Sequence, residues 1–217
     1  MSDLFGATAP TAADMRRLHE RLESEAQNAG VLDVAFTTVD SPVGALLLAS
    51  TDRGLVRVAY AVEDHDAVLD DLATRVGSRI LRAPRRLDAA ASQLDEYFAG
   101  SRLRFELDLD TELSSGFRRV VQRHLPDIAY GATESYKQVA ALVGNPNAMR
   151  AVGSACATNP LPIVVPCHRV LRTDGSLGGY IGGLEAKRAL LSLERSVLER
   201  SALERSAPHT RPSGDAS

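Results

Sequence analysis

The chain has 217 residues, of which 44% are hydrophobic and 24% charged, a composition that suits a globular protein with one large domain or two small ones. No apolar run approaches the length of a membrane span, and the first 17 residues lack the basic and apolar regions of a signal peptide, so we expect a cytoplasmic protein that does not contact membranes. Two cysteines exclude a disulfide framework and a cysteine-rich zinc site, the five histidines are scattered, and we predict no bound metal.

The first half of the chain combines strand and helix patterns. The spacing of apolar residues in 11–29 predicts an amphipathic helix, and turn signals such as Ser41-Pro42 separate the three strand candidates that follow, which predicts an antiparallel meander. The expected elements after the first helix are strands at 32–39, 43–50, 54–61 and 79–82 and helices at 64–75 and 87–98. Nothing in this half indicates chemistry.

The second half is predicted to be mostly helical. Helices are expected at 114–125, 135–143, 146–157 and 184–194. Gly144 suits the position just after a helix end, and Asn145 followed by Pro146 is a typical helix start. Two helices joined by so tight a turn indicate a helix-turn-helix.

These patterns predict an α/β (α+β) fold in which a small sheet-and-helix domain precedes a helical domain. The expected parts are an N-terminal extension (1–30), the sheet domain (31–112), the helix-turn-helix domain (113–195) and a tail (196–217). The Leu-Glu-Arg-Ser repeat near the end has a five-residue spacing that fits a helical face poorly, and prolines follow it. We therefore predict that the tail is a fraying helix followed by a disordered, dispensable end.

The net charge of −3 hides a basic segment. Residues 117–172 contain seven basic and only two acidic residues, an asymmetry that favours contact with nucleic acid, although charged faces are often merely solvated.

Within this segment, the helix expected at 146–157 has an unusually smooth surface. Met149, Val152 and Cys156 have positions suited to core packing. The small residues on the remaining surface are Ala148, Ala151, Gly153, Ser154 and Ala155, and only Arg150 projects from it. Two interpretations remain open: close packing against another helix, or approach to DNA with Arg150 entering a groove or the base stack.

The pentapeptide Pro166-Cys167-His168-Arg169-Val170 is the strongest chemical signal in the chain. A thiolate is the nucleophilic form of cysteine, and an unperturbed thiol with a pKa of about 8.5 is mostly protonated at neutral pH. The adjacent histidine could assist ionisation. A buried cysteine that only packs is the alternative, because neighbours in sequence need not touch in space.

Together these motifs resemble the O6-alkylguanine-DNA alkyltransferase family. The matching segments are Tyr130-Gly131, Ser135-Tyr136, Arg150-Ala151-Val152-Gly153, Asn159 to Val170, Asp174 to Tyr180 and Gly182 to Glu185, followed by the helix that ends in Glu194. The resemblance covers roughly residues 115 to 194. It implies that the first half, which fits by pattern only, is the family's ribonuclease-H-like domain.

The resemblance implies a nucleophile, a base and an orienting group. Cys167 resembles the thiolate that accepts the alkyl group, and His168 the base that deprotonates it through a water molecule. Glu194 resembles the group that orients the imidazole, and a glutamate at a helix C-terminus opposes the helix dipole, which favours a paired role over a solvated one. Asn159 resembles the asparagine that ties the recognition helix to the active-site strand.

The resemblance also implies how the base is reached. Double-stranded DNA carrying O6-alkylguanine is the expected partner, and the damaged nucleotide is extruded from the duplex. Arg150 resembles the finger that fills the vacated space, and Tyr136 the residue that rotates the nucleotide and donates towards guanine N3. Val170, Tyr180, Ile181 and Gly182 are expected to line the base pocket. The thioether product implies one reaction per molecule. We also expect no cofactor, no obligate protein partner and a monomer in solution.

Three other functions compete with this one. A non-catalytic lesion sensor would have the cysteine replaced. A Cys-His hydrolase would need an oxyanion hole that the sequence does not show, and a helix-turn-helix regulator would need a helix better able to read the major groove. The sequence departs from the family pattern in two ways. Ala129 stands where the family commonly has proline, and the cysteine-rich methyl-acceptor domain of some relatives is absent.

Overall fold

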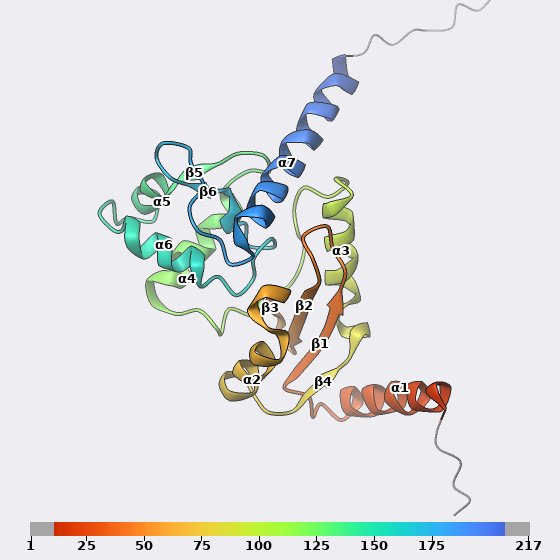
Figure 1. Cartoon of the computed structure of the whole chain (residues 1–217). Coiled ribbons are helices and arrows are strands. Elements are labelled where there is room, and N and C mark those ends of the chain that lie inside the picture. Colours follow the sequence, from red (N-terminus) through yellow and green to blue (C-terminus); the bar gives the residue numbers. More distant parts are fainter. Residues whose placement is uncertain (1–10, 207–217) are drawn as a thin grey trace, which may run out of the picture.

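The computed structural model describes residues 11–206, which form a sheet lobe and a helical lobe joined by a long C-terminal helix (Figure 1). The sheet lobe contains the first half of the chain and the helical lobe the second, so the predicted fold class is confirmed. Within the described residues no helix is long and apolar enough to cross a membrane.

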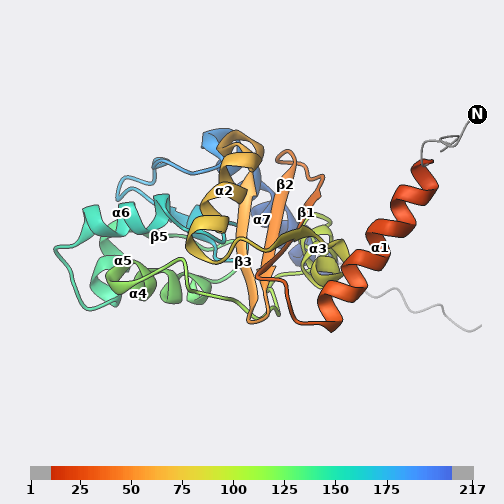
Figure 2. The same cartoon turned by 90° about the horizontal axis from the view of Figure 1, so that it is seen from below.

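The sheet has four strands in the order β3-β2-β1-β4. Its strands are β1 (Val34–Val39), β2 (Leu46–Thr51), β3 (Gly54–Tyr60) and β4 (Ile80–Arg82). The first three form the predicted antiparallel meander, with Thr37 opposite Leu48 and Leu48 opposite Val58, whereas β4 runs parallel to β1. This order leaves β3 as the edge strand that faces the helical lobe (Figure 2).

Helices cover both faces of this sheet. They are α2 (His65–Arg75) on one face and α3 (Asp88–Phe98) on the other, with 3-10 turns at Ala61–Glu63 and Pro84–Leu87. Helix α1 (Ala12–Asn28) projects away from the sheet, and its Met15, Leu18 and Leu22 side chains are exposed (Figure 1). Side chains alternate across a strand, and in β2 Leu46 and Leu48 join the core that contains α3 while Leu47 joins the core that contains α2. Because both of its faces are buried, β2 is apolar along most of its length rather than alternating.

The helical lobe surrounds a short parallel strand pair that the sequence did not reveal. Its helices are α4 (Gly116–His124), α5 (Tyr136–Leu142), α6 (Met149–Ala157) and α7 (Gly183–Ser206), with 3-10 turns at Leu125–Asp127 and Cys167–Arg169. Strands β5 (Glu134–Ser135) and β6 (Val170–Leu171) pair in parallel. The cysteine therefore lies in a 3-10 turn that leads into β6, and not in the strand that the resemblance implied.

Two helix boundaries differ from the prediction. Gly144 ends α5 with φ +79°, as expected, but α6 begins at Met149 rather than at Pro146. The intervening residues form a turn in which the Ala148 amide donates to the Asn145 carbonyl at 2.9 Å.

The second difference is at the C-terminus. Helix α7 does not end at Glu194 but continues to Ser206, so the prediction of a disordered tail is wrong for residues 196–206, and residues 207–217 lie outside the described part. Val197 is buried there, and a Cβ on Gly131 would collide with the Leu198 side chain, so both residues pack against the body of the protein. Tertiary contacts stabilise a helix that the five-residue repeat alone does not predict.

Candidate active site

Cys167 opens the 3-10 turn after Pro166 and is only 2% exposed. Its Sγ accepts a hydrogen bond from Nδ2 of Asn159 at 3.1 Å. Burial raises the pKa of the Cys167 thiol to about 11, against the opposing effects of the Asn159 hydrogen bond and of the Lys187 charge. The resting site therefore holds a neutral thiol, and its nucleophilic form requires removal of the proton.

Asn159 holds the segment that leads to the cysteine. Its Nδ2 also donates to the Val165 carbonyl at 2.7 Å, and its Oδ1 accepts from the Leu161 amide at 3.1 Å. Both amide protons and the oxygen of this fully buried side chain are thus used. Between these contacts Ile163 has φ +73°, an unusual conformation for a β-branched residue that the surrounding hydrogen bonds maintain.

His168, the residue after Cys167 in the 3-10 turn, forms a buried pair with Glu194. The Nε2 atom of His168 lies 3.0 Å from Oε1 of Glu194, and neither side chain is exposed. Burial lowers the pKa of His168 more than the neighbouring carboxylate raises it, so the imidazole is neutral. Nδ1 is buried and has no hydrogen-bond partner among residues 11–206, which leaves it able to accept a proton.

Glu194 is the centre of a hydrogen-bond network that sequence reasoning only partly identified. Burial raises its pKa, but the hydrogen bonds from His168 and Arg169 outweigh burial and hold the pKa at about 2. The Tyr97 hydroxyl and the Gly131 amide also donate to the carboxylate, each at 2.8 Å. Arg169 binds it at 2.8 to 3.2 Å and donates to the Ile128 carbonyl at 2.7 Å.

Of these partners Arg169 and Gly131 lie inside motifs that the sequence analysis quoted, whereas Tyr97 does not. Tyr97 comes from α3 of the sheet lobe, and no local pattern relates it to residue 194. Glu194 itself was predicted, and the structure brings it to His168 as expected.

Lys187 is a second buried group that sequence reasoning missed. Its Nζ donates to the Val170 carbonyl at 2.7 Å and lies 6.0 Å from the centre of the Tyr180 ring. Burial lowers the pKa of Lys187, opposed by the neighbouring cysteines. A lysine on a terminal helix normally indicates a solvated face, so its pattern gave no signal. The carbonyl of Val170, a residue expected to line the base pocket, therefore already accepts one hydrogen bond.

A glycine-rich loop covers the site. Tyr180, Ile181 and Gly182 lie in it, all partly buried, between β6 and α7. Tyr136 is the first residue of α5, and its ring lies against Gly178 of this loop. Burial raises the pKa of the Tyr136 hydroxyl, which keeps it protonated and able to donate. Tyr136 and Tyr180, which come from separate parts of the helical lobe, both lie close enough to Cys167 to interact with its charge.

Helix α6 exposes only part of the predicted DNA surface. Arg150, Ala151 and Ser154 are exposed, and Ala148 and Gly153 are half-buried. Ala155 is fully buried and its carbonyl accepts from Gln122 Nε2 at 3.1 Å, so its assignment to the DNA surface is wrong, because it lies on the core side of the helix. Met149, expected in the core, is instead 44% exposed, whereas Cys156 is buried as predicted.

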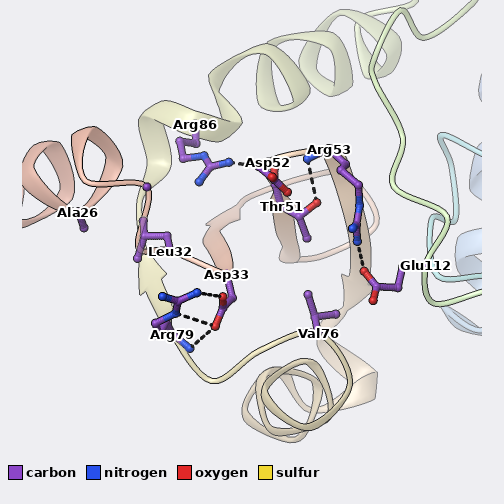
Figure 3. Close-up of a pocket in the computed structure, with 11 residues that line it drawn as sticks. Ala26, Leu32, Asp33, Thr51, Asp52, Arg53, Val76, Arg79, Arg86 and Glu112 are labelled. Carbon is purple, nitrogen blue, oxygen red and sulfur yellow. Dashed lines mark hydrogen bonds and ion pairs between the residues drawn. The ribbon is translucent and has the colours of Figure 1, made fainter.

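A separate cavity of about 510 Å³ lies in the sheet lobe, next to the end of α1 (Figure 3). Its charged walls are largely paired with one another: Arg79 with Asp33 and Arg53 with Glu112. None of its lining residues belongs to the segment that contains Cys167. Within residues 11–206 no group of three or more His, Cys, Asp or Glu side chains is placed to hold a metal ion.

Comparisons with known proteins agree with this arrangement. Residues 34–111 match the model of the ribonuclease-like domain of 6-O-methylguanine DNA methyltransferase, and residues 116–196 match that of its DNA-binding domain. The methylated-DNA–protein-cysteine methyltransferase of Mycolicibacterium paratuberculosis is 43% identical over 162 residues, 75% of this chain and 93% of the relative. The constitutive enzyme of Bacillus subtilis is 40% identical over 161 residues, 74% and 94% of the two chains.

Solved structures show the same relationship. A crystal structure of the Mycobacterium tuberculosis O6-methylguanine methyltransferase has a TM-score of 0.66 and 37% identity, covering 81% of this chain and 96% of its own. Another, of Mycobacterium tuberculosis OGT in complex with DNA, has a TM-score of 0.66 and 39% identity, covering 75% and 94%. With both halves of the chain matched and the cysteine, histidine and glutamate assembled in one buried site, the protein belongs to the 6-O-methylguanine DNA methyltransferase family.

Proposed function

We propose that this protein repairs DNA by direct reversal: it extrudes O6-alkylguanine from the duplex and transfers the alkyl group irreversibly to Cys167. The observation that carries the proposal is the buried free thiol of Cys167, followed directly in the chain by a histidine paired with Glu194, in a chain whose relatives are methylated-DNA–protein-cysteine methyltransferases. In the reaction Sγ attacks the alkyl carbon, an S–C bond forms, and the C–O6 bond breaks. The thioether has no easy route back to a thiol, so each molecule acts once and needs no cofactor.

The thiol proton passes to His168 in this mechanism. Nε2 is engaged with Glu194, so the unpartnered Nδ1 is the atom that receives the proton, through one bridging water molecule. The carboxylate, with its pKa held at about 2, stabilises the imidazolium that forms. Asn159 is a positioning residue here, because its amide donates to Sγ and favours the thiolate over the thiol.

The guanine leaves as an anion that a hydrogen bond from Tyr136 stabilises. The hydroxyl, kept protonated by burial, donates towards N3 of the base, and the thiol proton now on His168 balances the charge of the departing purine. Tyr180, Ile181 and Gly182 of the glycine-rich loop, together with the backbone at Val170, form the pocket that receives the extruded base.

DNA contacts come from α6. Extruding a base costs a few kcal/mol of unstacking, less for a mispaired damaged base. Arg150 is exposed and enters the base stack to replace the lost contacts, while Ala151, Gly153 and Ser154 allow the helix to approach the groove.

The protein acts as a monomer, in the cytoplasm, where its two free cysteines remain reduced. Residues 31–112 and 113–195 are its two domains, the second carrying both DNA surface and thiol.

Mass spectrometry tests the proposal. The protein is mixed with duplex DNA that contains one O6-methylguanine, and intact protein and peptides are weighed. We expect a single methyl-sized gain on the peptide that contains Cys167, and reaction that stops at one equivalent. Cys156→Ser is the matched control, because it removes the other thiol and should leave the gain unchanged. Binding to the lesion with Cys167 unmodified would instead indicate a sensor.

A further inference from the structure

The glycine-rich loop over Cys167 is held between two tyrosines that come from different lobes. At one end Gly178 lies against the Tyr136 ring, where an added Cβ would be 2.9 Å from ring carbons. At the other end Gly182 lies against Tyr60, the last residue of β3, where an added Cβ would be 2.6 to 2.7 Å from ring carbons. Neither position has space for a side chain, so both tyrosines fix where this loop can lie.

Tyr60 also holds the pocket residue Tyr180 directly. The two hydroxyl oxygens are 2.9 Å apart, and the rings meet edge-on with centroids 5.7 Å apart and an interplanar angle of 72°. The Tyr180 ring in turn meets the His168 ring edge-on at 6.4 Å and 88°. A residue of the sheet lobe is thereby connected through one side chain to the imidazole beside the thiol.

The anchor itself has little freedom to move. Tyr60 is only 2% exposed, and its amide donates to Oε1 of Glu63 at 2.8 Å. Two residues before Tyr60, the Val58 amide donates to the Pro160 carbonyl at 2.9 Å, which binds the edge strand β3 to the segment next to Asn159. The glycine-rich loop and the Asn159 segment are thus both held by β3.

This arrangement limits the space available to an alkyl group. Cys167 is almost fully buried and Tyr180 lies close enough to interact with its charge, so a group on O6 must find space beside a loop that the Tyr60–Tyr180 hydrogen bond holds in place. A methyl group needs little displacement of the loop, and a benzyl group needs more. We propose that Tyr60 is a positioning residue that determines substrate size, by holding Tyr180 and the 178–183 loop over the thiol. This inference rests on the proposed alkyl transfer.

The test compares Tyr60→Phe with the wild type on one duplex that carries either O6-methylguanine or O6-benzylguanine. Loss of one hydrogen bond should release Tyr180 while the ring still supports Gly182. The ratio of the benzyl rate to the methyl rate should rise about fivefold, the factor that corresponds to one ordinary hydrogen bond, with DNA affinity unchanged. Val62→Ala, two residues on and exposed, is the control that should leave the ratio unchanged.

A second pair of variants tests the packing contact between Gly182 and the Tyr60 ring. It also tests the positioning role of Tyr60 if Tyr60→Phe is unstable. Gly182→Ala forces a Cβ against the Tyr60 ring and should slow transfer of both groups. Combining it with Tyr60→Leu removes the obstructing ring carbons and should restore methyl transfer. An unchanged ratio in Tyr60→Phe, or no recovery in the double variant, would overturn the inference. Failure of the wild type to gain mass at Cys167 would instead overturn the proposed function.

Discussion

His168 Nε2 and Glu194 Oε1 are 3.0 Å apart and neither side chain is exposed to bulk solvent, although the two residues are 26 positions apart in the chain. Neither group has its ordinary protonation behaviour there: burial lowers the pKa of the imidazole, and the hydrogen bonds from His168 and Arg169 lower that of the carboxylate despite its burial. The pair therefore connects the chemistry of the site with the stability of the fold.

The first prediction concerns pH and stability. The unfolded chain takes up a proton at His168 near pH 6.5 and at Glu194 near 4.5, but the folded protein resists both until lower pH, about 2 for Glu194. Both contributions to the free energy of unfolding are present above these unfolded values and are lost as the pH falls. Urea denaturation should show stability falling from pH 7 to acidic pH. His168→Gln should flatten the part of this dependence near pH 6, and an unchanged slope would contradict the prediction.

The second prediction is that Glu194→Gln damages both fold and reaction. The neutral amide leaves the buried Arg169 guanidinium without its counter-charge, which should cost about 3 kcal/mol in the free energy of unfolding. The imidazolium also loses its stabilising carboxylate, so the transfer rate should fall about 100-fold. Urea denaturation and single-turnover kinetics measure the two effects. Glu185→Gln on the exposed first turn of the same helix is the matched control for both.

The third prediction concerns the thiol. With ¹³C-labelled cysteine in a Cys156→Ser background, an NMR titration should place the pKa of Cys167 above the ordinary thiol value, in the direction of about 11, because burial disfavours the thiolate. Asn159→Ala removes the hydrogen bond to Sγ and should move the pKa higher still and slow the transfer. A lower pKa in this variant would show that the amide does not favour the thiolate.

The fourth prediction separates DNA handling from chemistry. Arg150→Ala removes an exposed side chain, so the free energy of unfolding should change by less than about 0.5 kcal/mol. Transfer from O6-methylguanine in a duplex should nevertheless slow at least tenfold, about the effect of losing 1.4 kcal/mol of stabilisation of the extruded state. Transfer from the free base O6-benzylguanine should not change. Arg16→Ala on α1 is the control of equal charge, and an equal loss on duplex and free base would contradict a role in extrusion.

The fifth prediction concerns the C-terminal part of α7. Val197 is 5% exposed, so Val197→Ala should cost about 2 kcal/mol of folding free energy through the buried methyl groups that it removes. Leu203 is 72% exposed, and Leu203→Ala should change stability by less than about 0.5 kcal/mol. Equal small effects in urea denaturation would show that this part of the helix is as dispensable as the sequence suggested.

The sequence by itself determined the elements and the chemical centre. Turn residues and periodic apolar positions predicted the meander of β1 to β3 and most helices, because these signals act over a few residues. The pentapeptide around Cys167 and the motifs near it indicated the family, and the predicted pairing of His168 with Glu194 is present in the structure.

Only the tertiary structure decided which side chains complete the site. Ala155 is excluded from the DNA surface, and Lys187 and Arg169 are buried against backbone carbonyls, because packing rather than local pattern sets their environment. Tyr60 and Tyr180 are 120 positions apart, and their contact depends on β3 being the edge strand beside the helical lobe. The helix beyond Glu194 likewise exists because Val197 and Leu198 find partners in distant loops. Such contacts between distant residues leave no periodicity in one sequence, so only the folded chain reveals them.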